Sequence, residues 1–171
     1  MKKFLLALVV VFSAGTLMAQ TKIGHVNSQA LLDTMPSRAV AMQKLQQFEA
    51  DGYNELKEME ADLNKAISVY EGKRPNLSPM MIKIEEEKLM KKQQILQERE
   101  QSLSGEMQAY SQELNAPILK MVQDAVKMVS ERRKLNYVID ESITLYFAGG
   151  TDITDEVITE LLKMDAAASG N

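Results

Sequence analysis

The residues of this chain that could do chemistry are few, and they do not complement one another. His25 is the only histidine, and Ser28 follows it closely, so the two could be read as a base and a nucleophile. No group that would orient such a base can be located from the sequence, so we expect His25 to be a packed or interface histidine on a strand. With one histidine and no cysteine, the sequence predicts no disulfide, no thiol chemistry and no metal centre.

Two other patterns resemble known sites without meeting their requirements. Glu85, Glu86 and Glu87 could suggest an acid pair or a cation site, but consecutive helical residues point about 100° apart, so we expect a solvated face. The segment 149–152 reads Gly-Gly-Thr-Asp and lacks the lysine and the spacing of a phosphate-binding loop. We therefore expect no cofactor and no enzymatic activity, and we look for the function in binding surfaces.

The element that must position such surfaces is an α-helical, coiled-coil-like arm over residues 37–114. Ser78 can cap a second helix just after Pro75 has ended the first, so the two helices run antiparallel over roughly 50 Å. We expect Gly52 and Pro117 to interrupt the two helices, so that the arm pivots near its root. Apolar residues with heptad-like spacing form a loose seam between the helices: Leu56, Met59, Leu63, Ala66 and Tyr70 on the first, and Ile82, Leu89, Leu96, Leu103, Met107, Tyr110 and Leu114 on the second.

The N-terminus is typical of a secretory signal peptide. Lys2 and Lys3 precede a short apolar run over residues 4–12, and Ala19 is a small residue suited to cleavage, so we expect residues 1–19 to be removed. A retained anchor is the alternative, although the run is short for a bilayer span. Without the two lysines, 18 basic residues face 24 acidic ones, and this net charge of −6 argues against a nucleic-acid partner.

Residues 20–36 and 115–165 are predicted to form a small β-containing body at the root of the arm, followed by a flexible tail over 166–171. The expected strands cover residues 22–27, 135–140 and 143–148, the last two joined by a tight hairpin. The residues expected to be buried in the body or its oligomer core are Val138, Ile139, Ile143, Leu145 and Phe147. A body of roughly 65 residues buries too little surface to be comfortably stable alone, so we expect it to oligomerise.

The arm carries two candidate binding surfaces. Its tip is basic, and the segments nearer the root are acidic; the tip residues are Lys73, Arg74, Lys83, Lys88, Lys91 and Lys92. Apolar candidates on the root-side half are Met42, Phe48, Met59, Met107 and Tyr110. The basic residues could steer an acidic partner or be ordinary solvated helix faces. The apolar residues could contact a partner or simply fill the loose seam.

In the order and spacing of several segments, the chain resembles the Skp/OmpH family of periplasmic chaperones. The matching pieces are Lys22-Ile23-Gly24-His25-Val26-Asn27 after a signal peptide, the charged helical hairpin, Ala116-Pro117-Ile118, Val122-Gln123-Asp124-Ala125-Val126, Tyr137-Val138-Ile139-Asp140 and Asp152-Ile153-Thr154 with its closing helix. The resemblance implies a periplasmic homotrimer. Its chains would jointly form a small β-barrel body, and three arms would enclose unfolded outer-membrane proteins without ATP.

Two features depart from that family's pattern. Well-known members are basic overall, whereas this mature chain is acidic, so the sequence leaves open whether it binds lipopolysaccharide or a membrane surface and whether bulk charge captures its clients. Lys134 stands where related chains often have glycine after the last arm helix, so we expect the turn there to be made differently.

The expected function also follows from physical logic that is independent of the resemblance. An exported, long-armed chain without a cofactor, in a compartment without ATP, can act only by binding. Outer-membrane β-barrels in transit expose apolar faces and unpaired strand edges that aggregate, and a holdase would keep such clients apart. The alternative is a non-enzymatic spacer or adaptor of the cell envelope.

Overall fold

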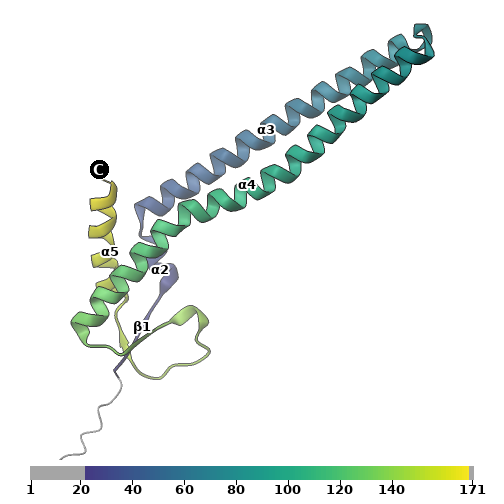
Figure 1. Ribbon diagram of the computed structural model, residues 1–171. Helices are drawn as coiled ribbons and strands as arrows, with labels where there is room; N and C mark the ends of the chain where they lie inside the picture. The colour runs from purple at the N-terminus through teal and green to yellow at the C-terminus, as the bar shows by residue number, and fades with distance from the viewer. Residues whose placement is uncertain (1–21, 170–171) are drawn as a thin grey trace, which may run out of the picture.

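The computed structural model of the protein describes residues 22–169, so the predicted signal peptide, its cleavage after Ala19 and residues 170–171 lie outside the described part. A long two-helix arm extends from a small body of helices and strands (Figure 1). In chain order the elements are β1 (Ile23–Val26), α2 (Ser28–Asp33), α3 (Pro36–Lys73), the 3-10 turn η1 (Arg74–Asn76), α4 (Pro79–Arg133), β2 (Tyr137–Asp140), the 3-10 turn η2 (Glu141–Ile143), β3 (Thr151–Asp152) and α5 (Thr154–Ser169). Within residues 22–169, no helix combines the length and hydropathy needed to span a bilayer.

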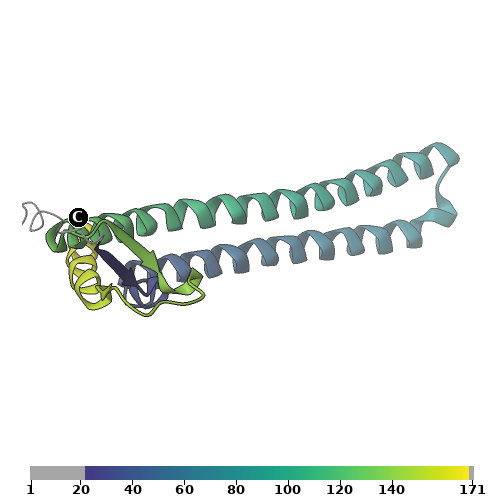
Figure 2. The ribbon, with the colours of Figure 1, turned by 90° about the horizontal axis from the view of Figure 1, so that it is seen from below.

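The mainly helical fold with an antiparallel hairpin arm is confirmed. Figures 1 and 2 show α3 and α4 running side by side from the body to a turn at the far end. The Ser78 hydroxyl accepts a hydrogen bond from the amide of Met81 at 3.4 Å, and Pro79 occupies the first position of α4, where no amide donor is needed. Ser78 and Pro79 therefore act as predicted, whereas Gly72 stays inside α3, which ends at Lys73.

Gly52 is a contact point between the arm helices, and the predicted interruption of the ascending helix there is wrong. Gly52 is buried inside the continuous helix α3, opposite Leu103 of α4, which is only 3% exposed. A Cβ atom at this position would lie 2.4 Å from Cδ1 of Leu103, so only glycine lets the two helices approach this closely. Pro117 likewise lies inside α4, which continues to Arg133, so the descending helix does not end and restart there as predicted.

The sheet of the body is open, and its strands pair in parallel. β1 lies in the centre, with β2 on one side and β3 on the other, and both neighbours run parallel to it. Gly24 of β1 is opposite Val138 of β2 and Thr151 of β3. Residues 22–169 of one chain therefore supply three short strands and no closed barrel, and over this range each outer strand has a free edge.

The predicted hairpin between residues 135–140 and a strand at 143–148 is wrong. After β2, the Asp140 carboxylate accepts a hydrogen bond from the Ser142 amide at 3.0 Å. The backbone carbonyl of Asp140 accepts a second one from the Thr144 hydroxyl at 2.8 Å. These local bonds favour a 3-10 turn over a two-stranded hairpin. The chain then runs without strand structure until Thr151, and β3 is the third strand.

The hydrophobic core of the body lies where α2, α4 and α5 meet beside the sheet. Its buried members are Val26, Leu31, Met35, Ala41, Ile118, Ala125, Val129, Ile153, Val157 and Leu161. Of the five residues predicted to be buried, only Val138 packs against this core. The other four, Ile139, Ile143, Leu145 and Phe147, are exposed in the single chain. Their alternating pattern therefore does not mark the core of one chain.

Helix α4 ends in the left-handed turn that glycine usually makes. Lys134 has φ 55° and ψ 42°, and its amide donates to the carbonyl of Glu131 at 3.2 Å. The amide of Leu135 donates to the carbonyl of Ser130 at 2.9 Å, which completes a Schellman motif. The expectation that this turn is made differently is wrong, because lysine adopts the left-handed conformation itself.

This conformation leads to a stability prediction. Replacing Lys134 by glycine is expected to raise the free energy of unfolding by about 1 kcal/mol, because the left-handed region costs an ordinary residue about 1–2 kcal/mol and glycine's greater unfolded-state entropy offsets only part of this. Urea denaturation at fixed protein concentration measures the change. The control is Lys127→Gly at an exposed interior position of α4, which is expected to lower stability by about 1 kcal/mol. A loss of stability in Lys134→Gly would contradict the prediction.

Candidate functional site

The root-side half of the arm brings the predicted apolar residues to two different environments. Met42 is 52% exposed on α3. Phe48 and Tyr110 face one another across the two helices, with ring centroids 5.0 Å apart, and both are half-buried. Met59 and Met107 are also half-buried and line separate shallow grooves of about 150 and 410 Å³ between the helices. Four of the five predicted apolar residues are therefore partly packed between the two arm helices, and Met42 is the most exposed of the five.

Apolar side chains other than the five predicted contacts are also exposed on the arm. Tyr53 is 57% exposed beside the groove that Met107 lines, and Met80 and Met90 nearer the tip are 68% and 70% exposed. The heptad pattern indicates that they are exposed, because none of the three occupies a position of the apolar seam between the helices. They extend the apolar surface of the arm from the root towards its tip.

The six predicted tip bases are all exposed, as expected for a surface that meets solvent or a partner. Lys88 pairs with Glu85 one turn away at 2.6 Å, and Arg74 lies 4.0 Å from Glu86. Glu86 also accepts a hydrogen bond from the Tyr70 hydroxyl at 2.6 Å, and this bond raises the pKa of Tyr70. Within residues 22–169 the other four bases make no ion pair. The tip thus presents basic charge, partly neutralised on one side.

The middle of the arm carries a polar cross-link that the sequence did not reveal. The Arg99 guanidinium of α4 donates to Glu55 of α3 at 2.9 and 3.0 Å and to Glu106 on its own helix at 2.8 Å. The hydrogen bonds that Arg99 donates to Glu55 raise the pKa of Arg99 most, and the bond that it donates to Glu106 raises it further. The Arg99 side chain therefore links the two helices. In the sequence, the same residue is only a polar position between the apolar seam residues Leu96 and Leu103.

The body exposes an apolar patch on the segment between β2 and β3, which we call the apolar loop and define as residues 143–147. Ile143 is 79% exposed, Leu145 105% and Tyr146 82%, while Phe147 is 47% exposed. In Figure 1 this segment projects away from the helices of the body. So many large apolar side chains on one short segment are typical of a surface that meets a partner.

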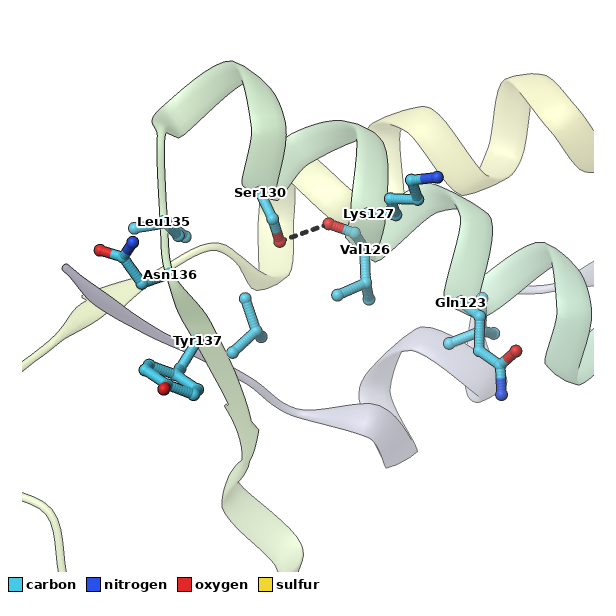
Figure 3. Close-up of a pocket in the computed structure, with 9 residues that line it drawn as sticks. Gln123, Val126, Lys127, Ser130, Leu135, Asn136 and Tyr137 are labelled. Atoms are coloured by element: carbon cyan, nitrogen blue, oxygen red, sulfur yellow. Dashed lines mark hydrogen bonds between the residues drawn. The ribbon is translucent and has the colours of Figure 1, made fainter. Parts of the chain in front are cut away.

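A shallow groove of about 360 Å³ lies between α4 and the start of β2 (Figure 3). The apolar side chains that line the groove include Val122 and Val126 of α4 and Val138 of β2. Tyr137, which is 64% exposed, also lines it. The Ser130 hydroxyl, which also lines the groove, donates to the carbonyl of Val126 at 2.6 Å (Figure 3). The groove is therefore bounded by α4 on one side and by the start of β2 on the other.

The fold also gathers a polar cluster that sequence reasoning missed. Nδ1 of His25 lies 2.6 Å from a carboxylate oxygen of Glu141, and the carboxylate of Asp152 is close by. The Asp152 carboxylate accepts hydrogen bonds from the hydroxyl and amide of Thr154 at 2.6 and 2.9 Å, which hold its pKa below the usual value. His25 is more than a hundred positions from both Glu141 and Asp152 in the chain, so no local spacing could have indicated the cluster.

The comparisons with known proteins agree with this fold. Residues 22–161 match the family described as outer membrane protein (OmpH-like). Chaperone protein Skp of Pectobacterium atrosepticum is 30% identical over 164 residues, and that of Photorhabdus laumondii is 26% identical over 165; each alignment covers 94% of this chain and 99% of the relative.

A solved structure of an OmpH-like chain from Caulobacter crescentus superposes with a TM-score of 0.74 at 16% identity, covering 85% of this chain and 86% of that one. This likeness shows a shared fold, and the family match extends over most of the described residues. The chain therefore belongs to the Skp/OmpH family.

Proposed function

We propose that the protein is a periplasmic holdase that acts without ATP, binds unfolded outer-membrane β-barrel proteins between its arms and prevents their aggregation. The observation that carries the proposal is the arm itself, which exposes Met42, Tyr53, Met80 and Met90 along its length instead of using them in a core. Relatives that align over nearly the whole chain are named chaperone protein Skp, which supports the same role. An unfolded barrel strand offers alternating apolar side chains that such a surface can bury.

The working form in this proposal is a homotrimer whose bodies join through the apolar loop and the free strand edges. The single chain leaves Leu145 and Tyr146 almost fully in water and leaves both outer strands unpaired on one side. Burying these groups against neighbouring copies would remove apolar surface from water and pair the free edges. Three arms held by one body would then enclose a space for the client.

A spacer or adaptor role is the second candidate, and the arm supplies an observation in its favour. The close Gly52–Leu103 contact and the Arg99–Glu55 hydrogen bonds make the middle of the hairpin stiffer than a loose seam would be. An aggregation assay separates the two functions. A holdase keeps a diluted, urea-unfolded outer-membrane β-barrel from scattering light at stoichiometric ratios, whereas a spacer leaves its aggregation unchanged.

The holdase proposal predicts that charge governs capture and apolar contact governs retention. Raising salt is expected to slow capture of a labelled unfolded barrel protein, because exposed charges are screened beyond a Debye length of about 8 Å at physiological ionic strength. Release of bound client should change little, since salt does not weaken apolar burial. Stopped-flow fluorescence across a salt series measures both rates.

Two sets of variants separate these contributions. Replacing the six tip bases by glutamine should reproduce the effect of salt on capture alone. Replacing Met42 and Tyr53 by serine should speed release alone, and because both side chains are more than half exposed, the seam stays packed. If salt strongly accelerates release while capture stays constant, charge holds the client and the proposed division is wrong.

A further inference from the structure

Three side chains of metal-ligating types meet on the sheet of the body, each supplied by a different strand region. His25 is on the central strand β1, and Asp152 on β3 is its direct neighbour in the parallel ladder. Glu141 follows the last residue of β2. One ligand atom from each of the three lies within 4.8 Å of the others. Strands β1 and β3 and the turn after β2 therefore bring one imidazole and two carboxylates together.

The imidazole is held in place from several sides. Its Nδ1 bonds the Glu141 carboxylate, and the ring of Phe147 packs against it with centroids 4.9 Å apart. Gly150 closes over the ring with φ 111°, and a Cβ atom there would lie 3.2 Å from Cδ2 of His25. Because φ is positive and the space is small, the chain can pass this close to the ring only with glycine.

The charge around the imidazole is not balanced by protein cations. Within residues 22–169, neither Glu141 nor Asp152 forms an ion pair with any lysine or arginine. In the same range, the second oxygens of both carboxylates and Nε2 of His25 make no hydrogen bond to protein. Two carboxylates thus share one imidazole and keep lone pairs available. This arrangement favours a cation that accepts both nitrogen and oxygen ligands.

We propose that His25, Glu141 and Asp152 form a binding site for a divalent transition metal of the zinc class, one per chain. One imidazole nitrogen with two carboxylate oxygens is a donor set that zinc uses, whereas magnesium and calcium prefer oxygen ligands alone. The metal takes the place of the hydrogen bond between His25 and Glu141, and the neutral imidazole keeps its one ring proton on the nitrogen that does not bind the metal. Bonds of about 2.0–2.2 Å require Asp152 to move inward, and its exposed side chain can rotate to do so.

The site would connect elements that are otherwise weakly joined. β3 has only two residues and is joined to β1 through Gly24↔Thr151 and His25↔Asp152. A metal bound by all three side chains would fix β3 and the start of the apolar loop to the central strand. Its effect should therefore appear in the body and leave the arm unchanged.

Isothermal titration calorimetry on the untagged mature protein tests the proposal. Zinc chloride is expected to bind at one ion per chain, and magnesium chloride is expected to give no binding heat. His25→Ala and Glu141→Gln should each weaken zinc binding by at least about tenfold, because loss of a direct ligand costs no less than loss of a supporting one. Asp124→Asn, at an acid on the arm-side helix α4, is the matched control and should bind zinc as the wild type does.

Thermal unfolding gives a second measurement that does not depend on any client. Zinc should raise the melting temperature of the wild type, and EDTA should reverse the rise, because a ligand that binds only the folded state stabilises it. Far-UV circular dichroism without zinc checks that the two site variants are folded. The absence of binding heat in the wild type, or equal zinc affinity in the wild type and folded site variants, would overturn the proposal.

Discussion

Replacing Leu145 by aspartate is expected to dissociate the proposed homotrimer into monomers while each chain keeps its fold. The Leu145 side chain is fully exposed in the single chain and contributes nothing to its core. At an interface between copies, the new carboxylate would be removed from water without a partner, which costs several kcal/mol at each site. Light scattering coupled to size-exclusion chromatography measures the mass, and circular dichroism measures the helix content.

The arm offers a matched control for this substitution. Met90 is 70% exposed on α4, and Met90→Asp adds the same charge at an apolar position far from the body. It is expected to leave the mass unchanged. A Leu145→Asp protein that elutes with the mass of the wild type would place the interface elsewhere. A wild type that is monomeric at micromolar concentration would end the homotrimer proposal.

Replacing Gly52 by valine is expected to separate the two arm helices around their closest contact. The added Cβ alone would lie 2.4 Å from Cδ1 of Leu103, and the two methyl groups increase the overlap. Overpacking of this kind typically costs about 1–3 kcal/mol. Hydrogen exchange should show faster exchange of the α3 and α4 amides near this contact, with the body unchanged.

Two variants show whether the effect comes from the contact and not from changing a helical glycine. Gly105 lies inside α4 with nothing within 4 Å of an added Cβ, so Gly105→Ala should stabilise the arm by about 0.5–1 kcal/mol. Gly52→Ala combined with Leu103→Ala should cost less than the sum of the single changes, because the smaller side chain makes room for the methyl group. If Gly52→Val is as harmless as Gly105→Ala, the helices do not depend on this contact.

The sequence by itself determined the arm, since its signals are local. The heptad spacing requires a partner helix, and Pro75 and Ser78 place a turn within a few residues, so an antiparallel hairpin is the simplest outcome. The resemblance to the Skp/OmpH family was also readable from the order of segments, and the family match over residues 22–161 confirms it. Exposure of the tip bases followed in the same way from their charge.

Tertiary structure alone decided how the body is built. Alternation over residues 143–148 indicates which side chains share a face, but it does not say whether a partner strand is near. β1 pairs in parallel with strands more than a hundred residues away, and the hydrogen bonds of Asp140 turn the chain aside before a hairpin can form. Periodicity records the neighbours along the chain and not those across space.

The same reason explains the individual residues that the sequence left open or misplaced. Gly52 looked like a helix breaker, but its role depends on Leu103, which lies opposite only once α4 has returned along α3. His25 looked isolated until folding placed Glu141 and Asp152 beside it. The role of each of these residues depends on a contact with a residue far away in the chain. Such contacts exist only when the helices and strands have packed together.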